Sequence, residues 1–178
     1  MNVSDLMTTP AKSCSTDDDL QRAAQIMWEN DCGSVPVVDC DGSVVGMITD
    51  RDICMAAYTQ GQPLRQIPVH RAMANHVHSV REVDPLEVVE ALMRRVQVRR
   101  VPVLDENGRL KGILSMNDLA RHGHRAVGRK TNGLSGDSVL QTLAAVCEPH
   151  PAASATERAS ANGGFRPDAG RTKASRTA

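Results

Sequence analysis

The sequence predicts a mixed α/β (α+β) fold built from two similar units related by a pseudo-twofold axis. Each unit has the order strand–helix–strand–strand–helix. A motif of glycine, two apolar residues, a hydroxyl residue, two variable residues and aspartate occurs at 46–52 and again at 112–118. Val-Pro-Val precedes both copies, at 35–37 and 101–103, and both features recur with an offset of 66 positions. A constant offset without a gap indicates a repeated structural unit.

The first unit is predicted over residues 1–61. It opens with a helical turn at 3–7 and a short strand around 12–14. Apolar residues at helical spacing from Leu20 to Trp28 then predict an amphipathic helix to about Asn30. The acidic run Asp17-Asp18-Asp19 suits the start of that helix, where free N–H groups favour negative charge. Gly33 is the predicted C-terminal cap.

The second half of the first unit is predicted to be a hairpin followed by a helix. An apolar strand at 34–38 leads into a turn at 39–42, and a second strand returns over 43–48. Thr49 lies where the strand gives way to a helix running to about Thr59. Gly61-Gln62-Pro63 ends that helix.

The second unit, predicted over 69–124 after a linker at 62–68, repeats this plan. Asp84-Pro85 marks the start of a helix, since the carboxylate can cap and proline is tolerated in the first turn. A strand at 101–104, an Asn107-Gly108 hairpin turn and a strand at 110–114 follow. Ser115 begins the last helix. One unit alone is close to the size at which a core is marginal, so two units packing together are expected.

The C-terminal part of the chain differs in composition. Residues 125–148 are predicted to be a linker and a short helix, because Val139, Leu140, Leu143 and Val146 follow Asp137 at helical spacing. Residues 149–178 contain one large apolar side chain, Phe165, among Ala, Ser, Gly, Pro and Arg. Such a segment cannot bury enough apolar surface to offset its ordering entropy, so a disordered tail is expected.

Charge and hydropathy limit the classes of function. The chain is formally neutral, with 21 basic and 21 acidic residues, but residues 1–124 hold 13 basic and 17 acidic residues. This acidic body argues against specific nucleic-acid binding, which needs a clustered positive surface. No stretch reaches the roughly twenty apolar residues that span a bilayer, and the N-terminus lacks the regions of a signal peptide. A cytoplasmic protein without a membrane partner is expected.

The cysteines and histidines leave a metal- or redox-responsive interaction or scaffold protein open as an alternative. The five cysteines form no CxxC pair, and an odd number suits reduced thiols. His76-x-His78 and His122-x-His124 are the nearest to ligand pairs, although surface histidines explain them as well. No metal site is predicted within one chain, and shared coordination across a dimer stays open.

The repeated Val-Pro-Val strand, turn and G-h-h-[S/T]-x-x-D motif, in that order and twice, resemble a tandem pair of cystathionine-beta-synthase (CBS) domains, the Bateman module. The resemblance covers roughly residues 1–124. Within that family, Gly46 to Ile53 together with Gln97 to Val103 are similar to small stand-alone bacterial CBS-pair proteins. The resemblance implies a non-catalytic regulatory module that binds AMP, ADP or ATP, or S-adenosylmethionine, as a regulatory ligand and requires no cofactor. It also implies a homodimer, with an unidentified effector protein as a further partner.

The resemblance assigns site residues by position. Asp52 and Asp118 become the ribose contacts, and an acceptor-only carboxylate can indeed take bonds from two vicinal hydroxyls. Thr49 and Ser115 become phosphate-side hydroxyls, each at a helix N-terminus where an anion can sit. Basic residues near the same ends add to the phosphate side, and apolar strand residues hold the base mainly through backbone. The phosphate-side residues are Arg51, Arg99 and Arg100. The residues that hold the base are Cys14, Val35, Pro36, Val80, Val101 and Pro102.

The two motifs are not equivalent in sequence. Asp50 places a negative charge where phosphate would approach in the first motif, whereas neutral Met116 and Asn117 stand in the second. The second also follows two arginines, and arginine binds phosphate bidentately. The second motif is therefore the expected nucleotide site.

Two other interpretations stay open. The motif residues are also ordinary helix caps, so the module can serve as a scaffold that binds no nucleotide. The arginines before the second strand can equally form a solvated face or an intersubunit row of salt bridges. An enzyme is not expected, because the sequence has no nucleophile–base pair at recognisable spacing and no phosphate-cradling glycine loop.

Overall fold

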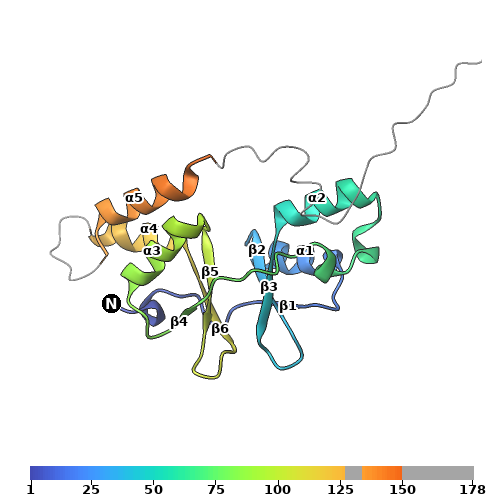
Figure 1. Cartoon of the computed structure of the whole chain (residues 1–178), viewed down its shortest axis with the longest axis horizontal. Helices are drawn as coiled ribbons and strands as arrows, with labels where there is room; N and C mark the ends of the chain where they lie inside the picture. The colour runs from blue at the N-terminus through green and yellow to red at the C-terminus, as the bar shows by residue number, and fades with distance from the viewer. Residues whose placement is uncertain (127–133, 150–178) are drawn as a thin grey trace, which may run out of the picture. The chain divides into compact units, whose positions relative to one another are not determined.

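The computed structural model describes residues 1–126 and 134–149 of the 178-residue chain. Most of the predicted linker and nearly all of the predicted tail lie outside these residues. The described elements form one compact unit within residues 1–148, and Figure 1 shows their order along the chain. Over the described residues, no helix is both long enough and apolar enough to cross a bilayer.

The first repeat has the predicted order of elements. After a 3₁₀ turn, η1, the strands form a sheet in the order β1-β2-β3. β1 pairs with β2 in parallel and β2 with β3 antiparallel, so the helix between β1 and β2 is the crossover. The elements are η1 (Val3–Asp5), β1 (Cys14–Ser15), α1 (Leu20–Glu29), β2 (Ser34–Val38), β3 (Val44–Thr49) and α2 (Asp50–Gln60).

The second repeat copies the first, down to the register of its sheet. Val37 pairs with Gly46, and 66 positions later Val103 pairs with Gly112, each next to the same irregularity. The mixed α/β fold of two related units is thereby confirmed. The elements are η2 (Leu64–Gln66), η3 (Val69–Arg71), β4 (Val80–Arg81), α3 (Leu86–Val96), β5 (Arg100–Leu104), β6 (Leu110–Ser115), α4 (Met116–Ala126) and the additional α5 (Gly136–Cys147).

Most of the predicted helix ends are confirmed, and two are wrong. Asp19 accepts the Arg22 N–H and caps α1. That helix ends at Glu29 with Asn30 as its C-cap, and Asp31 takes the left-handed backbone (φ 48°) predicted for Gly33, because a short polar side chain tolerates this conformation. Asp84 does not cap α3. Its carboxylate accepts the Arg81 N–H at 2.8 Å, and Pro85 is the residue that precedes the helix.

Each repeat completes the hydrophobic core of the other. Val3, from the lead segment of the first repeat, is fully buried in the core of the second, and Val69 is fully buried in the core of the first. The Val3 N–H donates to the Asp84 carbonyl at 2.9 Å, and the Val69 N–H donates to the Asp18 carbonyl at 2.8 Å. Both contacts are the same pair of positions with the repeats exchanged, which is the mark of a twofold relation.

Glycine allows the lead segments to approach the sheets. A Cβ on Gly112 would lie 2.7 Å from the Met7 Sδ and 3.0 Å from the Thr8 carbonyl oxygen. A Cβ on Gly46 would meet Met73 and the Ala74 carbonyl in the same way. The motif glycines therefore serve close packing between the repeats, which brings the backbone before β1 alongside β6.

Helix α5 breaks the symmetry by covering the helices of the second repeat (Figure 1). Its Val139 and Val146 join the core there, together with Leu134. Buried Glu90 accepts hydrogen bonds from the Ser138 hydroxyl at 2.8 Å and from the Thr142 hydroxyl at 3.2 Å.

Other α3 side chains complete the surface on which α5 packs, called here the seat of α5. Arg94 donates to the Thr142 Oγ1 at 2.9 Å, and Gln97 donates to the Ala145 carbonyl at 3.2 Å. Gly123 of α4 leaves room for the helix, because a Cβ there would lie 3.1 Å from the Val139 Cγ2. Apolar packing and a satisfied polar network therefore hold α5 in place.

The exchanged cores predict that a substitution in the lead segment of the first repeat destabilises the fold. Val3→Ala should lower the free energy of unfolding by about 2 kcal/mol, the cost of lost apolar burial and a small cavity. Val83→Ala is the matched control, because Val83 is 63% exposed whereas Val3 is fully buried. Urea titrations followed by circular dichroism measure both, and equal midpoints for the two variants would contradict the exchange of cores.

The seat of α5 predicts a second effect on stability. Thr142→Val keeps the shape of the side chain but removes the hydroxyl that bonds Glu90 and Arg94, so it should cost roughly 1–3 kcal/mol. Leu140→Ala, on the exposed side of the same helix, is the control. Thermal unfolding compares the two, and a Thr142→Val variant as stable as the control would show that this network holds nothing.

Candidate functional site

A cleft of about 430 Å³ lies where the second motif meets the first repeat. One wall is the junction of β6 and α4, which carries the motif. The other wall is the segment before β1 together with the end of α1 and the start of β2. The lining residues are Thr8, Pro10, Ala11, Lys12, Asn30, Asp31, Cys32, Ser34, Val35, Arg100, Ile113, Ser115, Asn117, Asp118 and Arg121.

The hydroxyl and the aspartate of each motif bond to each other. Ser115 Oγ donates to Asp118 Oδ2 at 2.6 Å, the Ser115 N–H donates to the same oxygen at 2.9 Å, and the Asp118 N–H returns a bond to Ser115 Oγ. Thr49 and Asp52 form the same capping box in the first repeat. The predicted helix-cap role of the motif is thus confirmed, and Asp118 uses its Oδ2 atom for this cap.

The second oxygen of Asp118 faces Arg121, which pairs with Asp118 Oδ1. Asp118 itself is 9% exposed, while the Arg121 side chain is largely exposed. An ion pair with one partner in solvent contributes little net free energy, so a ligand hydroxyl can compete for Oδ1. At the position equivalent to Arg121, the first repeat has Met55, which offers no such cation.

The N-termini of the two motif helices differ in what they offer an anion. In the first repeat, Asp50 Oδ1 accepts the Arg51 N–H at 2.7 Å, so the acid that follows Thr49 occupies this donor. In the second repeat, Met116 stands at the equivalent position and has no oxygen to do so. The N-terminus of α4 therefore keeps the positive end of its dipole free of a carboxylate at that position.

Ser34 is a buried hydroxyl in the wall of the cleft. It is 4% exposed, and its Oγ has no hydrogen-bond partner among the described residues. A buried polar atom without a partner costs free energy of roughly 1–3 kcal/mol, which a ligand can recover. The equivalent residue of the second repeat is Arg100, so a large cation occupies in one repeat the position that a small hydroxyl has in the other.

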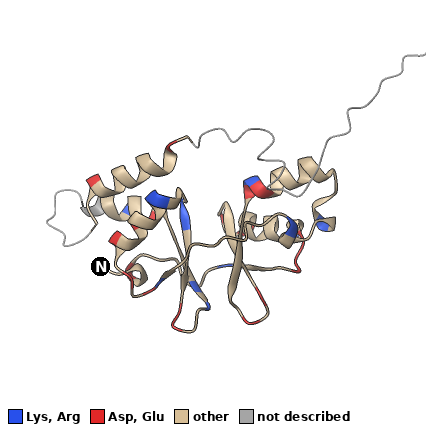
Figure 2. Cartoon of the chain, viewed as in Figure 1, with Lys and Arg blue, Asp and Glu red and all other residues tan. Residues whose placement is uncertain are grey.

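Three basic side chains line the cleft against two acidic ones. Lys12, Arg100 and Arg121 face Asp31 and Asp118. Figure 2 shows basic colour at the start of β5, the strand that Arg100 begins. The excess of positive charge suits a ligand with more than one negative charge.

The structure brings together some of the predicted site residues. Asp118, Ser115, Arg100 and Val35 line one cleft. Asp52 and Thr49 lie together at the start of α2, with Arg51 exposed beside them, and Arg99 is exposed before β5. The remaining predicted base contacts are buried in the two sheets and are not among the residues lining this cleft: Cys14, Pro36, Val80, Val101 and Pro102.

Most of the residues lining the cleft were not predicted as site residues from the sequence, and four polar ones among them are instructive. Thr8, Lys12 and Ser34 belong to the first repeat although the motif they face belongs to the second, and Arg121 lies three residues beyond the motif aspartate. The offset of 66 aligns equivalent residues but does not say that the repeats exchange partners. The one available signal for Ser34 was its alignment with Arg100.

The fold and the cleft define a tandem-repeat α/β module with a ligand-sized site between its repeats. The sequence profile of the CBS domain matches residues 3–58 and 65–125. The chain therefore belongs to the CBS domain family, as its motifs predicted.

Relatives of known structure share this arrangement. Hypoxic response protein 1 of Mycobacterium tuberculosis is 30% identical over 150 residues, covering 84% of this chain and 96% of its own. Its crystal structure, with two coordinated zinc ions, has a TM-score of 0.63 over 68% of this chain and 98% of that one, at 31% identity. This match bears out the predicted similarity to small stand-alone bacterial CBS-pair proteins.

Two further structures contain ligands. The CBS domain pair of protein MJ0100, in complex with 5′-methylthioadenosine and S-adenosyl-L-methionine, has a TM-score of 0.62 at 26% identity, covering 68% of this chain and 94% of that one. The CBS domain protein PAE2072 from Pyrobaculum aerophilum, complexed with AMP, has a TM-score of 0.61 at 29% identity, covering 67% and 90%.

The buried thiol of Cys14 gives a prediction for cysteine chemistry. Burial, with a smaller contribution from the charge of Asp18, raises the pKa of Cys14 from 9.0 to about 12. The protonated thiol therefore stabilises the fold at neutral pH, and this contribution is lost as the pH rises from 9.0 towards about 12.

At pH 8, Ellman's reagent should label Cys40, Cys54 and Cys147, which are exposed, well before Cys14, because the thiolate is the reactive species. The Cys14→Ser variant is the control and should lose none of the fast-reacting thiols. Labelling of Cys14 at the rate of the exposed cysteines would contradict its burial.

Proposed function

We propose that this protein is a non-catalytic regulatory module that binds an adenosine nucleotide in the cleft of its second motif. The observation that carries the proposal is the composition of that cleft: a buried motif carboxylate, an unpartnered buried hydroxyl and three basic side chains converge there. The carboxylate suits the hydroxyls of a sugar, the buried hydroxyl suits the polar edge of a base, and the basic side chains suit phosphate. The family membership and the AMP complex of PAE2072 support the same ligand class.

The ribose is proposed to bind Asp118. Asp118 Oδ2 stays in the helix cap, and Oδ1 accepts a ribose hydroxyl once Arg121 moves aside. Arg121 then carries an unpaired guanidinium next to the ligand. Because guanidinium binds phosphate oxygens bidentately, Arg121 joins Arg100 and Lys12 on the phosphate side.

The base is proposed to lie between apolar groups of both repeats. Val35 and Ile113 line the cleft from opposite sheets. The Ser34 hydroxyl, which is both donor and acceptor, can bond either type of atom on the edge of a purine. This contact gives the base a polar partner in addition to backbone groups.

The second motif is preferred over the first for two reasons. Asp50 places a carboxylate on the N–H that would meet phosphate at the first motif. Arg100 stands at the position that corresponds to Ser34, so a cation replaces the hydroxyl proposed to meet the base. Among family ligands, the basic lining of the second cleft favours AMP, ADP or ATP over the positively charged S-adenosylmethionine.

Binding is proposed to act through a homodimer or an effector protein. The cleft is built from both repeats, so a ligand that bonds Ser34 and Asp118 ties them together. Such a ligand stabilises this arrangement of the two repeats by as much as it binds this arrangement more tightly than any other. An assembly partner that favours the same arrangement would then bind more tightly.

Calorimetry with AMP and ATP tests the site. Asp118→Asn keeps an oxygen for the cap but loses the charge, so nucleotide affinity should fall roughly ten- to hundredfold, the value of a bond to a charged group. Asp52→Asn makes the same change at the first motif and is the matched control, expected to bind like the unaltered chain. Ser34→Ala should weaken binding to a smaller extent.

Two results would contradict the proposal. Weaker binding by Asp52→Asn alone would move the site to the first motif. Silence in a thermal-shift screen of adenine nucleotides and S-adenosylmethionine would favour the scaffold interpretation, because a ligand at a hundred times its dissociation constant stabilises by about 2.7 kcal/mol.

The two zinc ions of the solved hypoxic response protein 1 make a metal-responsive protein the second candidate. Within residues 1–126 and 134–149, no group of three or more His, Cys, Asp or Glu side chains is placed to hold a metal ion. A site would therefore need ligands from two chains, such as His76 and His78. Elemental analysis of protein purified without an affinity tag decides the matter, and stoichiometric zinc would favour this candidate.

A further inference from the structure

An ion pair on helix α4 has no counterpart in the first repeat. Arg121 donates from Nη2 to Asp118 Oδ1, while Asp118 Oδ2 accepts the hydroxyl and the N–H of Ser115. Both oxygens of the motif carboxylate are therefore engaged within the chain. At the position equivalent to Arg121, the first repeat has Met55, which carries no charge.

Burial explains why only the second repeat needs this arginine. Asp118 is 9% exposed, whereas Asp52 of the first motif is half-buried. A buried carboxylate is costly unless it is paired and hydrogen-bonded, so Asp118 requires a cation that Asp52, which water reaches, does not. The Arg121 side chain is itself 68% exposed. One end of the pair is thus fixed in the protein, and the other is free to move.

The position of Arg121 on α4 offers its side chain a second partner. Arg121 lies one turn beyond Asp118, on the same face of the helix. Helical side chains lean towards the N-terminus of their helix, and Arg121 lines the cleft together with Ser115 and Asn117, which lie at that end. The guanidinium can therefore leave Asp118 and stay in the cleft, on the side that the proposed function gives to phosphate.

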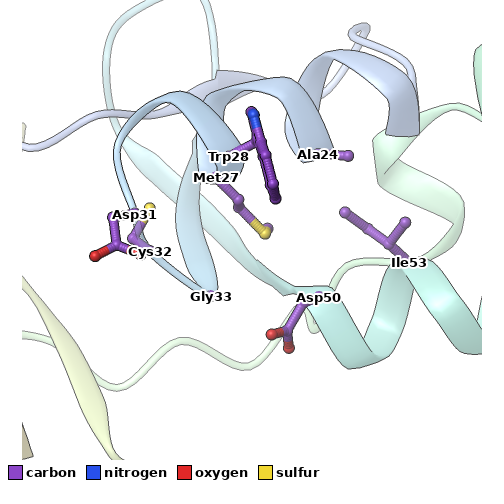
Figure 3. A pocket seen from close by; sticks show the side chains of 8 residues that line it. All are labelled: Ala24, Met27, Trp28, Asp31, Cys32, Gly33, Asp50 and Ile53. Carbon is purple, nitrogen blue, oxygen red and sulfur yellow. The ribbon is translucent and has the colours of Figure 1, made fainter.

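The first motif has an acid where the second has this arginine to offer. Asp50 opens α2 beside the pocket between α1 and α2, and Figure 3 shows its carboxylate pointing away from Ile53. Its Oδ2 lies against Gly33, where an added Cβ would be 2.9 Å from this oxygen. A phosphate group that approaches the start of α2 meets a carboxylate, and Met55 on the next turn offers no cation.

We infer that Arg121 makes the cleft selective for phosphorylated adenosine ligands over adenosine itself and over other adenosine derivatives without phosphate. This selectivity rests on the proposed function and narrows the class of ligand that the same cleft binds. A ribose hydroxyl takes Asp118 Oδ1 only after the ion pair opens. A nucleotide then supplies the released guanidinium with phosphate oxygens, which it binds bidentately. A nucleoside supplies no anion, so the broken ion pair is not replaced.

Most of the selectivity comes from the new contact and little from the loss of the old one. Because Arg121 is largely exposed, opening its pair with Asp118 costs little free energy. The contact between guanidinium and phosphate joins two charged groups and is stronger than a neutral hydrogen bond. Lys12 and Arg100 line the same cleft and add to the attraction for phosphate, whereas Asp31 opposes it. A ligand without phosphate uses none of these cations.

Calorimetry of the full chain with AMP, adenosine and 5′-methylthioadenosine tests this selectivity, with the weaker ligands measured by competition against AMP. The unaltered chain should bind AMP at least tenfold more tightly than the two ligands without phosphate. Arg121→Met installs the residue of the first repeat. It should weaken AMP binding roughly ten- to hundredfold, the value of a hydrogen bond to a charged group. Adenosine should bind this variant at least as well as before, because Asp118 Oδ1 is then free.

Two further variants separate this role from a structural one. Arg121→Lys keeps a positive charge beside Asp118 but loses the planar pair of donors, so it should recover part of the AMP affinity. Should circular dichroism show that Arg121→Met is unfolded, Arg121→Lys carries the test, because its affinity for AMP should fall while its affinity for adenosine does not. Arg95→Met removes an exposed arginine of α3 that does not line the cleft, and it should leave all three affinities unchanged.

The possible results separate this selectivity from the proposed function. An unaltered chain that does not bind AMP overturns the proposed function and the selectivity with it. AMP binding no tighter than adenosine binding, or an equal loss of both ligands in Arg121→Met, overturns the selectivity alone. An AMP affinity that Arg121→Met leaves unchanged does the same, since the guanidinium then makes no contact with phosphate.

Discussion

The exchange of lead segments between the repeats is the constraint on which the rest of the structure depends. Val3 fills the core of the second repeat and Val69 fills the core of the first. Neither repeat therefore has a complete core of its own. The cleft follows directly from this exchange, because the backbone that carries Thr8 must run along β6 to reach β1. The site is a by-product of the packing that holds the two halves together.

The repeats share a backbone but differ in the residues that decide function. Asp50 and Met116 occupy equivalent helix starts, and one of them uses a backbone donor that the other leaves to a ligand. The outer faces differ in the same way, since α5 covers only the second. Duplication supplies two of each surface, and a few substitutions give each copy its own role. In the proposed scheme the motif of the second repeat serves the ligand, and the helices of the same repeat carry α5.

The sequence was sufficient for the fold and for part of the site. Apolar periodicity, the Val-Pro-Val strands and Thr49 at its helix start all depend on nearby residues, and the structure agrees with them. Ser34 and Thr8 could not be predicted as neighbours of Asp118, because their contact depends on which repeat each lead segment joins. The cap at Gly33 was wrong because Asp31 accepts the left-handed backbone first.

The double use of the motif aspartate affects how such sequences are interpreted. Asp52 and Asp118 both bond the hydroxyl and the N–H at the start of their helices. A copy of the motif that has lost its ligand still loses a helix cap if the aspartate changes, which costs about 1 kcal/mol. Selection for stability alone can therefore preserve the motif. The number of motif copies in a chain does not give the number of ligands that the chain binds.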